Sequence, residues 1–149
     1  MSVATILKRK PPTIVTIEET ASVADAAQRL AQHRIGALPV MGAGGRLAGI
    51  LSERDVVRGV ATKGAAALSE PVSALMTAGV ETTTEVESIG DVMQRMTKGR
   101  FRHMPVLKDG RLIGMISIGD VVKETLKQQR YLIQQLESYI RGAYTGGLR

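Results

Sequence analysis

The 149-residue chain contains no cysteine, no tryptophan and only one phenylalanine. Without cysteine it has neither disulfides nor thiol chemistry, which weakly favours a reducing cytoplasm. Two histidines are too few for a His-rich metal site, and no Gly-x-Ser-x-Gly nucleophile motif is present. An enzyme, a catalytic residue and a catalytic cofactor are therefore poorly supported. The core has to be built from Ile, Leu, Val, Met and Ala.

Long apolar runs are also missing. No stretch of about 18 apolar residues occurs, so we expect no membrane span. Residues 1–10 carry a basic cluster without a long apolar run after it, so we expect no signal peptide. The length suits one compact domain. From the absence of cysteine we expect a cytoplasmic location.

The net charge of +6 has two interpretations. It either serves solubility alone or indicates an anionic partner, such as nucleotide phosphates, nucleic acid or a lipid surface. The scarcity of aromatic residues counts against base stacking, and so against a nucleic-acid partner. The run Lys8-Arg9-Lys10 is likewise either a solvated surface or a source of phosphate contacts.

What the chain does contain is an internal repeat with an offset of about 65 residues. Three segments recur: 22–30 as 88–96, 38–40 as 104–106, and 49–57 as 114–122. Two copies do not make a solenoid, which needs at least three units. The repeat predicts two subdomains related by a pseudo-twofold axis, with a shared seam that binds a ligand.

Each copy has the same order of expected elements. A β-rich stretch (13–17 or 80–84) precedes a helix capped by Ser22 or Ser88. Two strands joined by a tight turn follow, at 37–41 and 47–51 or at 103–107 and 112–116, and a helix starts near Asp55 or Asp120. Short helices are expected at 2–7 and 71–76, with Pro71 at the first helical position. The pattern predicts an α+β (α/β) fold of two β-α-β-β-α units.

The last helix is expected from about Asp120 to Arg141, with Gly142 ending it. It is longer than its counterpart in the first copy, and residues 132–140 carry much apolar surface. This surface either packs on its own domain or forms a dimer contact.

Two Gly-x-x-Ser-x-x-Asp segments are the candidates for chemistry. Ser52 with Asp55, and Ser117 with Asp120, stand where a strand ends and a helix begins. One interpretation is a capping box at the helix start. The other is a ligand site, in which the aspartate accepts two hydrogen bonds from a ribose diol and the helix N-terminus favours phosphate. The duplication favours the ligand site.

The two segments, with the Pro39 and Pro105 strands before them, resemble the signature of CBS domains, which are named after cystathionine β-synthase. The resemblance covers about residues 3–122. It implies a tandem pair, or Bateman module, that binds AMP, ATP or NAD(H) in two clefts and forms a homodimer. The implied division is unit 1 at 1–60, a connector at 61–70, unit 2 at 71–127, and a helix extension with tail at 128–149.

The resemblance also implies roles for individual residues. Asp55 and Asp120 would hold ribose hydroxyls, and Ser52 and Ser117 would contact ribose or phosphate. The adenine slots and first strands would contribute Gly36, Ala37, Leu38, Pro39, Arg102, His103, Met104, Pro105, Thr16 and Thr82.

Basic residues distinguish the two copies. Arg100, Phe101, Arg102 and His103 stand in the second copy, and arginine forks suit phosphate groups. We therefore expect the stronger nucleotide site in the second unit, although the resemblance implies that each cleft draws on both units. Arg54 is a further candidate, although Gly119 replaces it in the second copy.

The leading hypothesis is a regulatory module that senses adenine nucleotides and passes their occupancy to an unidentified partner protein. The alternative is a dimeric interaction scaffold whose nucleotide clefts are vestigial.

Overall fold

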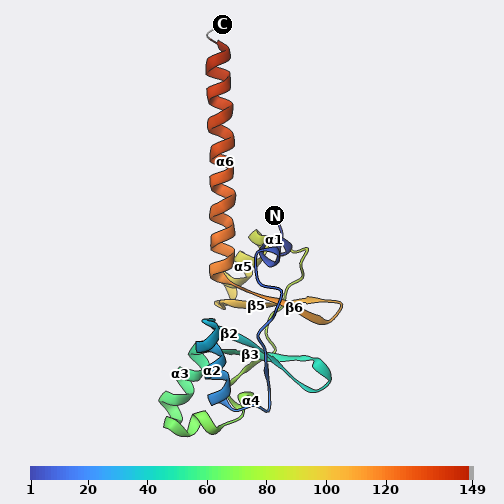
Figure 1. Ribbon diagram of the computed structural model, residues 1–149, viewed down its shortest axis with the longest axis vertical. Helices are drawn as coiled ribbons and strands as arrows, with labels where there is room; N and C mark the ends of the chain where they lie inside the picture. The colour runs from blue at the N-terminus through green and yellow to red at the C-terminus, as the bar shows by residue number, and fades with distance from the viewer. Residues whose placement is uncertain (148–149) are drawn as a thin grey trace.

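The computed structural model describes the backbone of residues 1–147 and the side chains of residues 1–143. It contains the helices α1 (Val3–Lys8), α2 (Val23–His33), α3 (Glu53–Lys63), α4 (Val72–Leu75), α5 (Ile89–Gly99) and α6 (Ile118–Gly147), and the 3-10 turns η1 (Ala43–Gly45) and η2 (Gly64–Ser69). Its strands are β1 (Ile17–Glu18), β2 (Ala37–Met41), β3 (Leu47–Ser52), β4 (Thr77–Ala78), β5 (His103–Lys108) and β6 (Arg111–Ser117). The predicted α+β class with a long C-terminal helix is confirmed (Figure 1).

The two hairpins form the centres of two sheets. β2 pairs with β3 in a four-stranded sheet of order β1-β2-β3-β4, and β5 pairs with β6 alone. The β-rich stretches before each first helix pair less than expected. β1 covers only Ile17–Glu18, and the matching stretch has one bridge, between Thr83 and Val106. Most of these two stretches therefore lies outside the sheets.

The helix starts and ends repeat between the halves. The Ser22 and Ser88 hydroxyls each accept a hydrogen bond from the backbone N–H three residues later, at 3.1 Å. Arg34 and Arg100 end α2 and α5 in the left-handed conformation, with φ of 53° and 55°. Pro71 differs from expectation, because it is the extended N-cap of α4 and not its first helical residue.

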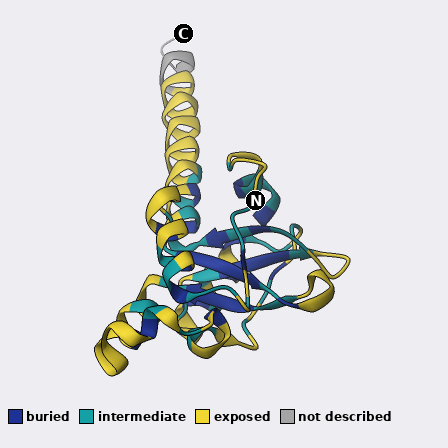
Figure 2. Cartoon of the chain, turned by 60° about the horizontal axis from the view of Figure 1, so that its bottom comes forward, coloured by how far each residue is buried: buried dark blue, intermediate teal, exposed yellow. Residues whose placement is uncertain are grey.

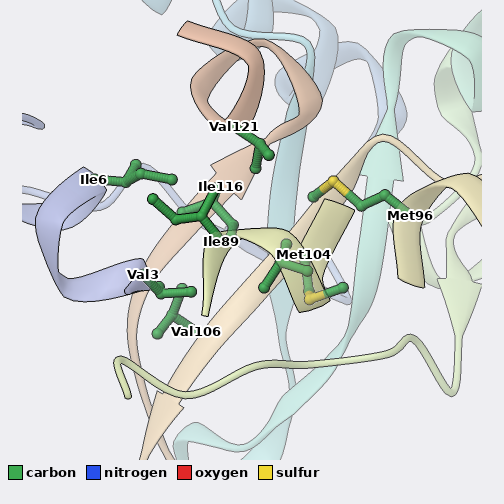
Figure 3. Close-up of a cluster of buried hydrophobic side chains, with 9 residues drawn as sticks. Val3, Ile6, Ile89, Met96, Met104, Val106, Ile116 and Val121 are labelled. Atoms are coloured by element: carbon green, nitrogen blue, oxygen red, sulfur yellow. The ribbon is translucent and has the colours of Figure 1, made fainter. Parts of the chain in front are cut away.

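The molecule has two hydrophobic cores, and each includes a short helix from a distant part of the chain. Val3 and Ile6 of α1 pack in the core of the second half, with Ile89, Val92, Met96, Met104, Val106, Ile116 and Val121. Figure 3 shows the α1 side chains beside Val106 and Ile116. In return, Val72 of α4 packs in the core of the first half, with Ile17, Ala26, Leu30, Leu38, Val40 and Leu51. Each half therefore depends on a short helix from the other part of the chain.

Helix α6 extends well beyond the body of the molecule (Figures 1 and 2). It runs to Gly147, so the prediction that Gly142 ends it is wrong. A glycine inside a helix costs only about 1 kcal/mol relative to alanine, which a long helix tolerates. Val121 and Glu124 are buried at its base, whereas residues 129–143 are exposed. The interpretation that residues 132–140 pack on their own domain is therefore wrong. None of the described helices is long and apolar enough to cross a membrane.

Candidate functional site

Two cavities lie where residues of the two halves meet. We name them the Asp55 cavity, of about 560 Å³, and the Asp120 cavity, of about 570 Å³. Both volumes fall in the range of small-molecule sites. Each contains one of the two repeated Ser-x-x-Asp pairs.

The Asp55 cavity is rich in guanidinium groups. The first half contributes Arg54 and Arg58, and the second half contributes Arg100 and Arg102. Apolar lining comes from Ile50, Val80 and Phe101, and the remaining lining residues are Gly36, Ser52, Glu53, Asp55, Thr77, Gly79, Glu81, Gly99 and His103. Arginine pairs with phosphate in a bidentate manner, so this lining suits an anionic ligand with an apolar part.

The Asp120 cavity has fewer charged side chains, and one of its cationic side chains is a lysine. Lys10 and Arg34 line it together with His33 and His103. Its other lining residues are Pro11, Thr13, Ile14, Val15, Ile35, Gly36, Ala37, Pro39, Met115, Ser117 and Asp120. The segment after α1 thus runs along one wall of this cavity.

Both aspartates form capping boxes. The Ser52 amide donates to Oδ2 of Asp55 at 2.9 Å, and the Asp55 amide donates to Oγ of Ser52 at 3.2 Å. At Ser117 and Asp120 the matching distances are 2.9 and 3.1 Å. Each capping bond uses Oδ2, and Oδ1 has no hydrogen bond among the described residues. A capping box and a ligand site are therefore compatible, because the carboxylate is fixed at the cavity wall with one oxygen left over.

Lys10 makes the two aspartates unequal. Its Nζ donates to Oδ2 of Asp120 at 2.8 Å and to the Met115 carbonyl at 2.6 Å. Burial by itself would raise the pKa of Asp120. The hydrogen bond and charge of Lys10, with the hydrogen bonds from Ser117, outweigh burial and hold that pKa below its ordinary value. Asp120 is therefore ionised and already paired with a cation.

Next to Lys10, Arg9 links the same segment to α6. Its guanidinium donates to Oε2 of Glu124, which is only 3% exposed. The second carboxylate oxygen of Glu124 is buried without a hydrogen-bond partner among the described residues. Residues 9 and 10 thus join the Asp120 cavity to the base of the C-terminal helix.

His103 and Gly36 form a wall that the two cavities share, since both residues line both cavities. A Cβ added to Gly36 would lie 3.3 Å from Nε2 of His103, so the two are in close contact. Burial, followed by the charge of Lys10, lowers the pKa of His103 despite the opposing charges of Asp120 and Glu53. The imidazole is therefore neutral at pH 7.

Each cavity combines predicted residues of both units. Arg100, Phe101 and Arg102 line the Asp55 cavity and not the cavity of Asp120, which is the aspartate of their own unit. Conversely, Ala37 and Pro39 of the first half line the Asp120 cavity. Each site draws its aspartate from one half and much of its opposite wall from the other.

Five predicted residues line neither cavity. Leu38 and Met104 are fully buried in the cores, and Pro105 is buried within β5. Thr16 and Thr82 accept hydrogen bonds on their carbonyls from Arg29 and Arg95, at 2.6 and 2.9 Å. The linings instead include residues 13–15 and 80–81, earlier in the same β-rich stretches.

Comparison with known proteins gives matches over most of the chain. The CBS domain family model matches residues 3–62 and 72–127. The mitochondrial CBS domain-containing protein CBSX3 of Arabidopsis thaliana is 41% identical over 127 residues, which is 83% of this chain. The chain spans 62% of the length of that relative.

Two solved structures are similar in fold and sequence. A CBS-domain containing protein from Agrobacterium tumefaciens is 46% identical with a TM-score of 0.78, covering 82% of this chain and 91% of that one. A CBS domain protein from Pyrobaculum aerophilum complexed with AMP is 27% identical with a TM-score of 0.72, covering 80% of this chain and 89% of that one.

Proposed function

The chain belongs to the CBS-domain family, and we propose that it is a regulatory module that binds adenine nucleotides in its Asp55 and Asp120 cavities. The observation that carries this proposal is that each capping-box aspartate lines a cavity with cationic side chains, while its Oδ1 accepts no hydrogen bond from the described residues. The similar protein complexed with AMP supports an adenosine-containing ligand.

In the Asp55 cavity, the ribose hydroxyls donate to Oδ1 of Asp55. The phosphates lie towards the arginines of both halves, and the amides at the start of α3 add favourable charge there. Adenine packs against the apolar wall formed by Ile50, Val80 and Phe101. AMP, ATP and NAD(H) all carry these three parts, and the arginines favour the ligands with more than one phosphate.

We propose that the Asp55 cavity binds more tightly than the Asp120 cavity. A ribose in the Asp120 cavity has to share the Asp120 carboxylate with Lys10, whose ammonium group already neutralises that carboxylate. The Asp55 carboxylate makes no ion pair among the described residues. This reverses the order expected from the arginines of the second copy alone.

Binding would regulate by changing the arrangement of the two halves. Because each cavity has walls from both halves, a ligand bridges them. It shifts their arrangement only as far as it binds one arrangement better than another. We further propose that the chain acts in the cytoplasm as a homodimer that passes nucleotide occupancy to a partner protein.

Calorimetric titration with AMP, ATP, NAD+ and NADH tests the proposal. Asp55→Asn is the informative variant. The asparagine oxygen still accepts the capping bond from the Ser52 amide, but the side chain has no charge and carries an NH2 group in place of Oδ1. We expect at least about tenfold weaker binding, equal to about 1.4 kcal/mol. The matched control is Asp25→Asn, at the same position of the exposed capping site of α2. Absence of binding by all four ligands at about 1 mM, a Kd equivalent to −4.1 kcal/mol, would refute the proposal.

A vestigial scaffold is the second candidate, favoured by the capping bonds that both aspartates already make. It predicts a dimer whose assembly and partner binding respond to no nucleotide. A variant with Asp55→Asn and Asp120→Asn together would then behave as the wild type does.

A further inference from the structure

The projecting part of α6 exposes a row of apolar side chains. Ile133, Leu136 and Ile140 lie in this row, with exposed fractions between 55% and 63%. Surface helices normally turn their apolar stripe towards a core, and contiguous exposed apolar patches mark interaction sites. Within the described part of the chain nothing covers this row, so its spacing has to identify the occupant.

The row has the spacing of a coiled coil. Its members recur alternately four and three residues apart, as the d and a positions of heptads do. They are Val122, Leu126, Gln129, Ile133, Leu136, Ile140 and Ala143. Gln129 is its polar member, and a single polar residue in such a row lowers stability but specifies register. A second copy of α6 has the matching spacing.

The residues that flank the row determine how the second helix runs. Arg130 and Glu137 lie on one side, at heptad position e, and Leu132 and Tyr139 lie on the other, at position g. In an antiparallel pair, e residues face e residues and g residues face g residues. Arg130 then meets the partner's Glu137, and Leu132 meets the partner's Tyr139. In a parallel pair, e faces g, and Leu132 would meet the carboxylate of the partner's Glu137.

We infer that two copies of this chain associate through α6 as an antiparallel coiled coil, with the twofold axis between Ile133 and Leu136. The inference rests on the homodimer of the proposed function and assigns its interface. At 1.5 Å per residue, residues 122–147 span about 39 Å. In this register the end of each helix lies beside the partner's Val122. The two nucleotide-binding bodies then lie at opposite ends, as the extended helix in Figure 1 allows.

The first test places a charge in the row. Ile133→Glu in the full chain is compared with Tyr131→Glu, since the two side chains are similarly exposed, at 55% and 60%, but Tyr131 lies on the opposite face. Sedimentation velocity over a concentration series should show a dimer for the wild type and for Tyr131→Glu. For Ile133→Glu we expect a dimer dissociation constant at least about a hundredfold higher, equal to about 2.7 kcal/mol. A monomeric wild type, or an unchanged Ile133→Glu dimer, would overturn the inference.

The second test determines the orientation. Arg130→Glu and Glu137→Arg should each weaken the dimer about tenfold, because each creates like-charge pairs twice across the twofold axis. The double exchange should restore affinity to within about threefold. Rescue is required, because Glu137 also pairs with Arg141 of its own helix at 3.6 Å. Failure of the double exchange to rescue would overturn the antiparallel arrangement.

Nucleotide titration separates this inference from the function proposed above. An Ile133→Glu monomer that still binds nucleotide supports the α6 interface and leaves the cavities as the ligand sites. A wild-type dimer that is dissociated by Ile133→Glu but binds no nucleotide supports the interface and refutes the nucleotide function alone.

Discussion

The crossed cores predict that a mutation in α1 damages the second half of the molecule and not the first. Ile6 is 4% exposed and packs with Ile89, Val106 and Ile116. Truncation to alanine removes its buried methyl and methylene groups and leaves a cavity, so Ile6→Ala should cost about 3 kcal/mol. For a chain of this length the loss corresponds to a fall of about 6–12 °C in Tm.

Hydrogen exchange shows which half is affected. Ile6→Ala should accelerate exchange in α5, β5 and β6, although these elements lie at least eighty residues away in the chain. Val72→Ala is the mirror experiment, because Val72 is fully buried in the first core. It should cost about 2 kcal/mol and accelerate exchange in α2 and β2. If Ile6→Ala instead affected α2 and β2, the assignment of α1 to the second core would be refuted.

Three further predictions concern the shared wall, a close contact and the ion pair. His103 has a lowered pKa, so the unfolded chain binds more protons near pH 6 and stability should fall as the pH drops below about 6.5; His103→Gln should flatten this part of the urea-stability profile. Gly49→Ala should destabilise by about 1–3 kcal/mol in urea unfolding, because its Cβ would clash with the backbone carbonyl oxygen of Thr77. Asp120, whose pKa is lowered mainly through Lys10, stabilises the fold above about pH 4 and loses this effect in acid; Lys10→Met should reduce the acid-dependent loss, and an unchanged acid profile would contradict the ion pair.

Local features were well predicted from the sequence because each depends on near neighbours. The serine caps of α2 and α5 and the two hairpins occur where their residue patterns indicate. The capping boxes at Asp55 and Asp120 also follow from residues three positions apart. The end of α6 was not predictable in this way, because the cost of one glycine in a helix is small against the length of the helix.

The composition of the cavities depends on tertiary packing, which the repeat does not encode. Because Arg100 and Arg102 belong to the second copy, the sequence favoured a stronger site in the second unit, although clefts that draw on both units were expected. In the folded chain the turn after α5 instead faces the start of α3 in the other half, and so these arginines reach the Asp55 cavity. Lys10 enters the Asp120 cavity for the same reason, because α1 packs on the second core and the chain must return from there to β1.

This return path gives the Asp120 cavity a direct connection to the C-terminal helix. Lys10 binds Asp120 in the cavity, and its neighbour Arg9 binds Glu124, one turn further along α6. A ribose that draws Asp120 away from Lys10 therefore acts on a segment held at both α1 and α6. We expect occupancy of this cavity to alter exchange at the base of α6, whereas a ligand confined to the Asp55 cavity lacks that link. Nucleotide-dependent hydrogen exchange around Glu124 that is retained in Asp55→Asn and lost in Lys10→Met would support this route. If the nucleotide-dependent change in exchange around Glu124 persisted in Lys10→Met, this route would be contradicted.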